Sequence, residues 1–444
     1  MGLATFQGGL HTYDGKDLSQ DKPIQKLLPQ GELVFSLAQH IGAPANAIVS
    51  VGDHVLMGQK IGEAGGFVSA NIISSVSGTV KAIEPRMTAS GREVLSVVIE
   101  NDGEYEATPD FGKKRDYKSL SREQIIDIIK EAGIVGMGGA AFPTHVKLSP
   151  PDANKIDYVI VNAAECEPYL TSDYRMMIET AQSLIEGLKI ELSLFPNAKG
   201  IIGIEDNKPE AIKTLRELLA GESNIEVKVC QTKYPQGGER TLIYATTGRK
   251  IWSRKLPYEV GCIVSNVGTV IAIYNAVALS TPLISRIVTV TGAGVQNPSN
   301  FDAKIGTSLT ELVEAAGGFV GNPKKVISGG PMMGQALYTL EQSVAKNTSG
   351  ILALPEDDVA DSITTACIRC GRCAQVCPSR VIPQKMYLAA THNDVDSFLA
   401  LDGMECCDCG CCTQACPAKI DLLNSFRVMK KVVVEKRASS SQKK

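Results

Sequence analysis

Eight cysteines near the carboxyl end of the chain form two runs with identical spacing, Cys-x2-Cys-x2-Cys-x3-Cys-Pro. The first run consists of Cys367, Cys370, Cys373 and Cys377, and the second of Cys406, Cys409, Cys412 and Cys416. In this arrangement three thiolates of a run bind one [4Fe-4S] cluster, and the fourth, which precedes the proline, reaches the other cluster. We therefore predict two clusters, one on Cys367, Cys370, Cys373 and Cys416 and the other on Cys406, Cys409, Cys412 and Cys377.

Zinc is the alternative metal for such cysteines. Zinc knuckles have longer gaps between their cysteine pairs and seldom repeat a run that ends in proline, so the spacing favours clusters. Cys407 and Cys411 are additional to the predicted ligands. Two clusters on one short segment form a one-electron relay, and neither accepts a hydride. A chain with such a relay therefore needs a two-electron partner or a flavin to exchange electrons with a nicotinamide nucleotide.

A glycine-rich loop over residues 133–148 is the second segment that could do chemistry. It contains Gly-x-Gly-x-x-Ala from Gly136 to Ala141, but it follows a predicted helix and is interrupted by Pro143, unlike a dinucleotide-binding fingerprint. No Gly-Lys-Ser or Gly-Lys-Thr makes it a Walker loop. Backbone without side chains nevertheless lets amide groups approach a phosphate, and Lys147 adds a positive charge.

Length, charge and cysteine distribution limit the class of protein. The 444 residues correspond to about three domains. A net charge of −3 argues against a nucleic-acid-binding protein. Ten of the 13 cysteines lie between Cys367 and Cys416, and the amino terminus lacks the features of a signal peptide, which together indicate a reducing, cytosolic compartment. Residues 260–285 carry no charge, but their polar side chains and Pro282 favour a buried strand and helix over a membrane span.

The elements that position these segments follow from hydrophobic patterns. Residues 51–61 and 74–83 read as the two halves of a barrel-sandwich hybrid of the lipoyl-carrier type, although residues 62–80 contain no lysine for attachment of a prosthetic group. Ser121 and Gln124 form a capping box before a helix. Strands at 156–161, 200–204 and 225–229 alternate with helices at 173–194 and 209–219, which predicts a parallel sheet covered on both faces.

The remaining segments are shorter. From residue 286 a small α+β domain is predicted, with strands at 287–291 and 326–330 and a helix near 308–316, followed by a polar linker at 346–350. Residues 427–444 carry seven basic side chains against Glu435, which is typical of a solvated or disordered tail rather than a docking site. Cys166, alone beside acidic residues, is expected to be an unreactive thiol.

Four blocks resemble the flavoprotein subunit of respiratory complex I. Residues 136–147 resemble its Gly-x-Gly-Gly-Ala-Gly-Phe-Pro-Thr-x-x-Lys loop, residues 162–168 its Asn-Ala-Asp-Glu-x-Glu-Pro block, residues 236–242 its Cys-Gly-Glu-Glu-Thr-Ala-Leu block, and residues 264–269 its Asn-Asn-Val-Glu-Thr block. With the barrel-sandwich start and the cysteine runs at the end, nearly the whole chain resembles the C subunit of the Rnf ferredoxin:NAD⁺ oxidoreductase family.

The resemblance implies a multidomain α/β protein with a Rossmann-like flavin domain. The expected parts are a barrel-sandwich hybrid at 1–112, an FMN- and NADH-binding α/β domain at 113–285, a β-grasp (SLBB) domain at 286–345, a helical ferredoxin-like domain with two [4Fe-4S] clusters at 355–430 and a basic tail at 431–444.

It also implies site residues. Glu165 and Glu239 are the candidate catalytic residues that face the nicotinamide, and their charge favours NAD(H) over NADP(H). The candidate cofactor-binding residues are Gly136, Gly138, Gly139, Lys147, Asn162, Glu165, Glu167, Gly238, Ser265, Asn266 and Thr269. Ala164, Arg240 and Ser265 depart from the complex I pattern, so a loosely held, exchangeable FMN is compatible with the sequence.

The function implied is that of a peripheral subunit on the cytoplasmic face of a membrane-bound, ion-translocating oxidoreductase. FMN would exchange a hydride with NAD(H), and the clusters would pass single electrons to or from the membrane and iron–sulfur subunits of the same complex and, indirectly, ferredoxin. Two alternatives remain open. One is a soluble NADH-dependent reductase similar to cobalamin reductase or to an electron donor of amino-acid reductases, and the other is an iron–sulfur adaptor without flavin.

Overall fold

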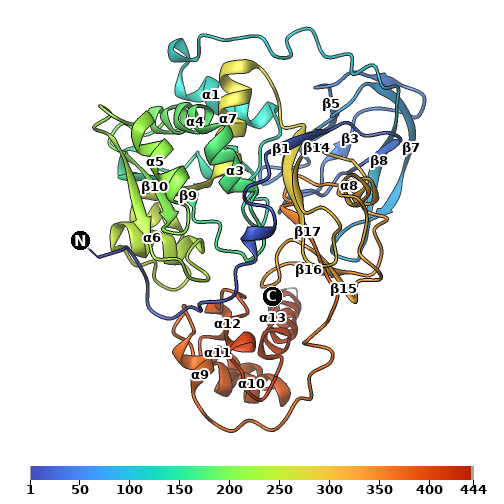
Figure 1. Cartoon of the computed structure of the whole chain (residues 1–444). Helices are drawn as coiled ribbons and strands as arrows, with labels where there is room; N and C mark the ends of the chain where they lie inside the picture. The colour runs from blue at the N-terminus through green and yellow to red at the C-terminus, as the bar shows by residue number, and fades with distance from the viewer. Residues whose placement is uncertain (1, 442–444) are drawn as a thin grey trace.

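The computed structural model describes residues 2–441. Four parts follow one another along the chain: two small antiparallel sheets, a parallel sheet with helices on both faces, a six-stranded mixed sheet, and a group of helices (Figure 1). The multidomain α/β class predicted from the sequence is therefore confirmed.

The first part consists of two antiparallel sheets. One has the order β2-β8-β7-β4, and the other has the order β3-β5-β6. Leu33, Phe35, Ile61, Ile72 and Ile99 of these strands are fully buried. The strands are β2 (Glu32–Ser36), β3 (Asn46–Ala47), β4 (His54–Val55), β5 (Lys60–Glu63), β6 (Ile72–Ile73), β7 (Gly78–Met87) and β8 (Glu93–Asn101). This is the arrangement expected for the barrel-sandwich hybrid, and its β5–β6 hairpin spans the segment in which a carrier would have its lysine.

The segment before β2 crosses the other parts of the molecule. Ala4 bridges to Cys230 and Leu10 to Tyr234, while the Gly9 amide donates to the Val376 carbonyl at 2.8 Å. Farther on, β1 (Ile24–Leu27) pairs in parallel with β14. The sequence analysis assigned residues 1–112 to one domain. In the structure, the residues before β2 pack on the parallel sheet, the C-terminal helices and the mixed sheet.

The second part is a four-stranded parallel sheet of order β11-β10-β9-β12. Helix α6 contacts one face, and α4 and α7 contact the other. The elements are α1 (Arg122–Glu131), α2 (Thr144–Lys147), β9 (Tyr158–Ala163), α3 (Ser172–Glu179), α4 (Ala181–Ser193), β10 (Lys199–Glu205), α5 (Pro209–Leu218), β11 (Ile225–Cys230), α6 (Glu239–Thr247), β12 (Cys262–Asn266) and α7 (Val267–Leu279).

Two local expectations in this part have different outcomes. The capping box of Ser121 and Gln124 is present at the start of α1. The single helix expected at residues 173–194 is wrong, because Thr180 leaves the helical conformation with φ −131° and its hydroxyl donates to the Met176 carbonyl at 2.8 Å, so that α3 ends and α4 begins there.

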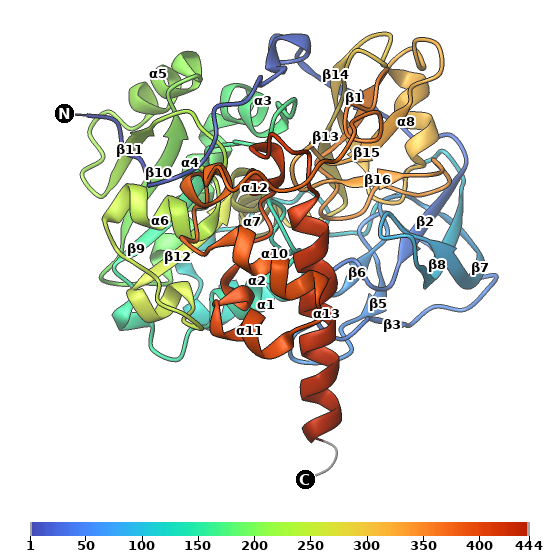
Figure 2. The ribbon, with the colours of Figure 1, turned by 90° about the horizontal axis from the view of Figure 1, so that it is seen from below.

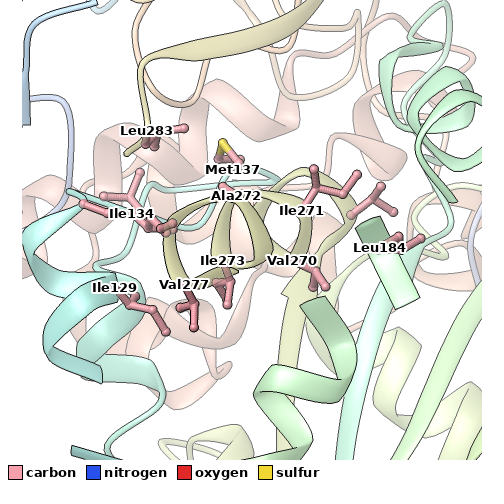
Figure 3. Close-up of a cluster of buried hydrophobic side chains, with 14 of the residues drawn as sticks. Ile129, Ile134, Met137, Leu184, Val270, Ile271, Ala272, Ile273, Val277 and Leu283 are labelled. Atoms are coloured by element: carbon pink, nitrogen blue, oxygen red, sulfur yellow. The ribbon is translucent and has the colours of Figure 1, made fainter. Parts of the chain in front are cut away.

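The uncharged stretch at residues 260–285 is the strand and helix expected. Helix α7 is buried on nearly all sides, and Val270, Ile273 and Val277 pack among Ile129, Ile134 and Leu184 (Figure 3). An all-round apolar helix is typical of a protein interior as well as of a membrane. Among the described residues, no helix is both long enough and apolar enough to cross a bilayer.

The third part is a mixed sheet of order β1-β14-β13-β17-β15-β16 with one helix. Its elements are β13 (Ser285–Thr291), β14 (Ser299–Lys304), α8 (Leu309–Ala315), β15 (Lys325–Ser328), β16 (Gln335–Leu337) and β17 (Gly350–Leu354). Residues 346–349 of the expected polar linker form a turn and loop, but the segment packs within the third part instead of leading directly to the cysteine runs. Strand β17 lies inside the sheet, and the buried Lys346 ammonium donates to the carbonyls of Asn71 at 2.5 Å and Gly133 at 2.6 Å, which joins the first three parts.

The fourth part consists of helices that lie together at one end of the molecule (Figure 1), and Figure 2 views the molecule from that end. They are α9 (Arg372–Gln375), α10 (Pro383–Thr391), α11 (Val395–Ala400), α12 (Cys411–Gln414) and α13 (Leu422–Ser441). The solvated or disordered tail expected at residues 431–444 is helical as far as Ser441, and its residues 434–439 are exposed. Phe426, Met429 and Val433 are buried on one face of α13, so the helix continues to Ser441, and residues 442–444 lie outside the described part.

Candidate functional site

One cavity of about 1260 Å³ is lined by residues from all four parts of the molecule. The predicted glycine loop, the loop after β9 and the β12–α7 junction form much of its wall. All candidate catalytic and cofactor-binding residues line it, namely Gly136, Gly138, Gly139, Lys147, Asn162, Glu165, Glu167, Gly238, Glu239, Ser265, Asn266 and Thr269.

The glycine loop is held in place from two sides. The Met137 amide donates to the Thr269 hydroxyl at 2.9 Å, and the Met137 carbonyl accepts from Nη2 of the buried Arg286 at 3.2 Å. A Cβ atom at Gly138 would lie 2.9 Å from the Cβ of Asn266. A side chain at this position would therefore displace the loop from the β12–α7 junction.

Two buried hydroxyls and the bare loop fit a ligand with a phosphate and a polar ring. Thr144 Oγ1 and Tyr234 OH are on residues that line the cavity, and neither has a hydrogen-bond partner among the described residues. Buried polar atoms of this kind are normally paired, so their position is consistent with a bound polar molecule. The residues present thus fit FMN, with glycine backbone for its phosphate and polar groups for its ring system.

The side chains of Lys147 and Glu239 face one another at the cavity. Their Nζ and Oε1 atoms are 3.7 Å apart, and Lys147 also donates to the Val264 carbonyl at 2.8 Å. The Glu239 side chain remains 44% exposed because it stands in the first turn of α6. This carboxylate is therefore free to meet a ligand that enters the cavity.

The carboxylate of Glu165, unlike that of Glu239, accepts hydrogen bonds from backbone amides. Its carboxylate accepts from the amides of Asp173 at 2.6 Å and Tyr174 at 3.2 Å in the first turn of α3, and it lies 4.0 Å from the Lys16 ammonium. Burial raises the pKa of Glu165, and the charge of Lys16 opposes this effect. Glu165 thus lines the cavity while its oxygens stabilise a helix N-terminus.

Glu167 connects two parts of the molecule. Its Oε1 accepts from the amides of Met332 at 2.7 Å and Met333 at 2.9 Å, in the loop between β15 and β16. Burial raises its pKa, and these two amides oppose the shift. The structure thus places this acid where it can position the third part of the molecule against the loop after β9.

The two predicted asparagines are bonded to the protein framework. Asn162 Nδ2 donates to the Gly237 carbonyl at 2.8 Å. Asn266 caps α7 by accepting from the Gly268 amide, and its Nδ2 donates to Asp173 Oδ2 at 2.6 Å. Both side chains therefore fix the loops around the cavity.

The two cysteine runs lie against each other, since α9 and α12 are in contact. Burial raises the pKa of Cys412 to about 12, and Cys406 and Cys377 add to the shift, which places these three thiols together. Burial also raises the pKa of Cys373, with added contributions from Cys367 and Cys370. Cys377 of the first run is thus near Cys406 and Cys412 of the second, and Cys373 also acts on Cys412. The two complete ligand sets stay a prediction.

The runs differ in their surroundings. Cys409 is buried and lines the large cavity together with the exposed Cys407, whereas Cys367 and Cys370 are exposed and are not among the residues that line it. Among the described residues, no three Cys, His, Asp or Glu side chains form a group that could hold a single metal ion. The cluster assignment therefore rests on the spacing, on the grouping of the thiols and on the family match reported below.

Sequence reasoning missed several residues of this site. Arg286 and Asp173 are buried ionic groups beside the glycine loop and the β12–α7 junction, and their partners are far away in the sequence. Phe67, at the turn of the β5–β6 hairpin, lines the cavity and is 76% exposed. The sequence signal for this hairpin was the absence of a lysine, which indicates that the hairpin does not carry a prosthetic group. The reading of Cys166 is supported, because burial, followed by the charge of Glu205, raises its pKa to about 12.

Comparisons with known families agree with this organisation. Four family models match in order: the RnfC barrel sandwich hybrid domain at residues 4–104, the Nuo51 FMN-binding domain at 129–275, the SLBB domain at 287–336 and the 4Fe-4S dicluster domain at 366–420. These matches support the predicted FMN and [4Fe-4S] cofactors.

Among solved structures, an NAD⁺-reducing [NiFe]-hydrogenase in the air-oxidized state is similar in fold. Its TM-score is 0.50 at 20% identity, and the match covers 73% of this chain and 68% of that one.

Curated relatives are similar over most of the chain. The C subunit of the proton-translocating ferredoxin:NAD⁺ oxidoreductase complex of Clostridium ljungdahlii is 44% identical, over 86% of this chain and 84% of its own. The C subunit of the Na⁺-translocating complex of Acetobacterium woodii is 41% identical over 98% of each chain. The C subunit of the ion-translocating oxidoreductase complex of Pseudomonas aeruginosa is 41% identical over 98% of this chain and 56% of its own. The chain therefore belongs to the family of C subunits of Rnf-type ferredoxin:NAD⁺ oxidoreductase complexes.

Proposed function

We propose that the chain is the peripheral NAD(H)-reacting subunit of an ion-translocating ferredoxin:NAD⁺ oxidoreductase at the cytoplasmic face of the membrane. Electron transfer in such a complex agrees with its family and with its FMN and [4Fe-4S] domains. Hydride exchange with NAD(H), coupling to ion movement and contact with the membrane and iron–sulfur subunits are the parts that we propose.

The observation that carries the proposal is the position of Cys407 and Cys409 on the wall of the cavity that the glycine loop also lines. Bound FMN supplies the step that converts a two-electron hydride into single electrons. The cysteine run beside the cavity is then the nearer electron acceptor. We propose that the other run, whose Cys367 and Cys370 are exposed, faces a partner.

The chain's own residues hold and orient the ligands. We propose that the amides at Gly138 and Gly139 bind the flavin phosphate, while the Gly136 amide shapes the loop by donating to the Phe142 carbonyl at 2.8 Å. We also propose that Thr269 and Arg286 fix the loop through Met137. Asn162 and Asn266 hold the neighbouring loops in position through their hydrogen bonds. Ser265 and Gly238 also line the cavity, and we propose that they contact the flavin ring.

The two candidate catalytic acids have separate roles in this proposal. Glu239 offers an exposed carboxylate at the cavity, and Lys147 holds it from one side. A carboxylate there disfavours the 2′-phosphate of NADP(H) through like-charge repulsion. Glu165 positions α3 and the loop after β9, since both of its oxygens accept helix amides.

The test uses the full chain, prepared anaerobically with reconstituted clusters and FMN. We expect about eight irons and one FMN per chain, bleaching of the flavin by NADH, and NADH-dependent reduction of ferricyanide. Absence of NADH oxidation with both cofactors loaded would overturn the proposal and leave the flavin-less adaptor. Equal turnover with NADPH would contradict the role of Glu239.

A further inference from the structure

A carboxylate of the fourth part is held by two side chains of the second part. Glu405 directly precedes Cys406, the first cysteine of the run beside the cavity. Its Oε2 atom accepts from Arg240 Nη1 at 2.8 Å, and its Oε1 atom accepts from the Ser253 hydroxyl at 2.7 Å. Because each oxygen has its own partner, both the position and the orientation of this carboxylate are fixed.

Arg240 brings this contact to the wall of the cavity. It stands in the first turn of α6, directly after Glu239, whose side chain is exposed at the cavity. Helix α6 lies at the end of the second part that faces the fourth part (Figure 1). Arg240 is also one of the three positions at which the chain departs from the complex I pattern. The structure gives this departure a partner, since the arginine faces a carboxylate of the cysteine-bearing part.

The ion pair thus joins the start of α6 to the start of the second cysteine run. Glu405 is followed by the segment in which Cys407 and Cys409 line the cavity. Arg240 shares its helical turn with the residues of α6 that line the same cavity. Without the pair, the beginning of the run is free to move relative to the beginning of α6.

Other contacts attach the fourth part to the molecule. The Gly9 amide donates to the Val376 carbonyl at 2.8 Å, and the Cys411 thiol donates to the Tyr234 carbonyl at 3.8 Å. Tyr234, Cys409 and Cys411 also form one buried cluster. The Arg240 side chain is 44% exposed, and exposed ion pairs contribute little to stability. We therefore expect the pair to fix the placement of the second run and to have little effect on the melting temperature.

We propose that Arg240 and Glu405 are positioning residues that set the distance between the cavity and the cluster on the second cysteine run. In each transfer one electron leaves the cluster and enters the flavin, so that the cluster is oxidised by one electron and the flavin is reduced by one. Two transfers, with protons from water, reduce the flavin by an electron pair. Arg240 and Glu405 exchange neither electrons nor protons. This inference rests on the proposed function, because it assigns residues that position its flavin and cluster.

The experiment compares R240E, E405R and the exchanged pair R240E/E405R in the full chain loaded with FMN and clusters. Each protein is reduced with dithionite, freed of excess reductant and mixed with NAD⁺. Loss of hydride from the reduced flavin gives a first phase of NADH formation. The cluster electrons reach NAD⁺ in a second phase, and electron paramagnetic resonance of frozen samples follows the oxidation of the clusters.

In R240E and in E405R we expect the second phase to slow about tenfold, because small displacements between reacting centres cost large factors in rate. The first phase, the iron content and the flavin content should match those of the parent chain. In R240E/E405R the ion pair is restored with opposite orientation, so the second phase should return close to the parent rate.

Hydrogen exchange gives a readout that does not depend on electron transfer. The amides of residues 403–412 should exchange faster in R240E and E405R than in the parent chain, and R240E/E405R should again resemble the parent. The control K213E breaks the exposed ion pair of Lys213 and Glu217 within α5 and changes the net charge as R240E does. It should match the parent chain in both measurements.

Parent-like cluster oxidation in both single variants would overturn the proposal. So would an exchanged pair that is as slow as the single variants, because the effect would then come from each side chain separately. If a charge reversal lowers the iron content, R240Q replaces it, since it removes the ion pair without adding a repulsion, and a parent-like second phase in R240Q would also overturn the proposal. Absence of the first phase in the parent chain would instead count against the proposed function.

Discussion

The hydroxyl of Thr269 accepts the amide of Met137 at 2.9 Å and thereby ties helix α7 to the glycine loop. Thr269 is 2% exposed, so water cannot replace this bond. Thr269→Val removes the acceptor at nearly constant volume and leaves a buried amide unpaired, which costs about 1–3 kcal/mol. We expect FMN to bind about tenfold more weakly, as measured by quenching of flavin fluorescence in a titration.

Thr269→Ser is the matched control, because it retains the hydroxyl. It should bind FMN like the parent chain. Equal FMN affinity in the Val variant would show that the glycine loop keeps its position without this bond.

The β5–β6 hairpin has no lysine for a prosthetic group. It places Phe67 on the wall of the cavity instead. An exposed aromatic ring on the wall of a nucleotide site can stack on a base, which contributes about 1–3 kcal/mol. Phe67→Ala should therefore raise the dissociation constant of NAD⁺ about tenfold in a calorimetric titration and leave that of FMN unchanged.

Phe67→Trp should restore binding of NAD⁺. Val51→Ala removes another exposed apolar side chain of the same part, away from the cavity, and should have no effect. Equal NAD⁺ affinity in Phe67→Ala and the parent chain would show that the hairpin does not contribute to nucleotide binding.

The order of strands and helices between residues 156 and 230 could be predicted because buried parallel strands are continuous apolar runs. The break at Thr180 could not, since a helical pattern continues through it and the break is a local change of the backbone, with φ −131° at Thr180. The helix at the end of the chain was not predicted, for a different reason. Its basic residues suggested a tail, but Phe426, Met429 and Val433 recur at helical spacing and are buried.

The candidate site residues could be named from four short blocks, and the structure brings them all to one cavity. The hydrogen-bond partners of each carboxylate could not be predicted. Glu165 and Glu167 both looked like ligand-facing acids, yet the first accepts amides of α3 and the second accepts amides about 165 residues away. Such partners depend on the packing of separate domains, which local sequence does not encode.

We propose that Glu239, whose side chain is 44% exposed at the cavity, selects NAD(H). Glu239→Gln removes the negative charge while keeping the shape of the side chain. We expect kcat/KM with NADPH to rise about fivefold at low ionic strength, and the gain to shrink at high salt, because Coulomb repulsion between exposed charges is screened.

In the Glu239→Gln variant, kcat/KM with NADH should change little. The control Glu217→Gln alters an exposed acid of α5 and should leave both nucleotides unaffected. A fall with NADH and no gain with NADPH would assign Glu239 to hydride transfer rather than to nucleotide selection.

Ligand choice within the second cysteine run is testable because Cys407 and Cys409 both line the cavity. The spacing assigns Cys409 to a cluster and leaves Cys407 free. Cys407→Ser should therefore retain about eight irons per chain, and Cys409→Ser should retain about four. Iron and acid-labile sulfide contents of anaerobic protein give the result, and loss of iron in Cys407→Ser would require a different ligand register.

Glu191 in α4 provides a test of stability against pH. It is fully buried, and neither carboxylate oxygen has a hydrogen-bond partner among the described residues. Burial raises its pKa from 4.5 to about 7, and the nearby Ser265 hydroxyl and Lys147 ammonium only partly oppose the shift. Between these two values the unfolded chain loses the proton while the folded chain keeps it, so stability falls as pH rises, by about 3 kcal/mol at most.

Glu191→Gln cannot ionise and should remove this contribution. We expect its melting temperature to exceed that of the parent chain at about pH 8 and to be close to it at about pH 5, since the folded carboxyl is protonated there. Glu226→Gln, which alters an exposed acid on β11, should follow the parent chain at both values. A Glu191→Gln gain of equal size at both pH values would mean that packing, rather than the cost of burying a charge, sets the difference.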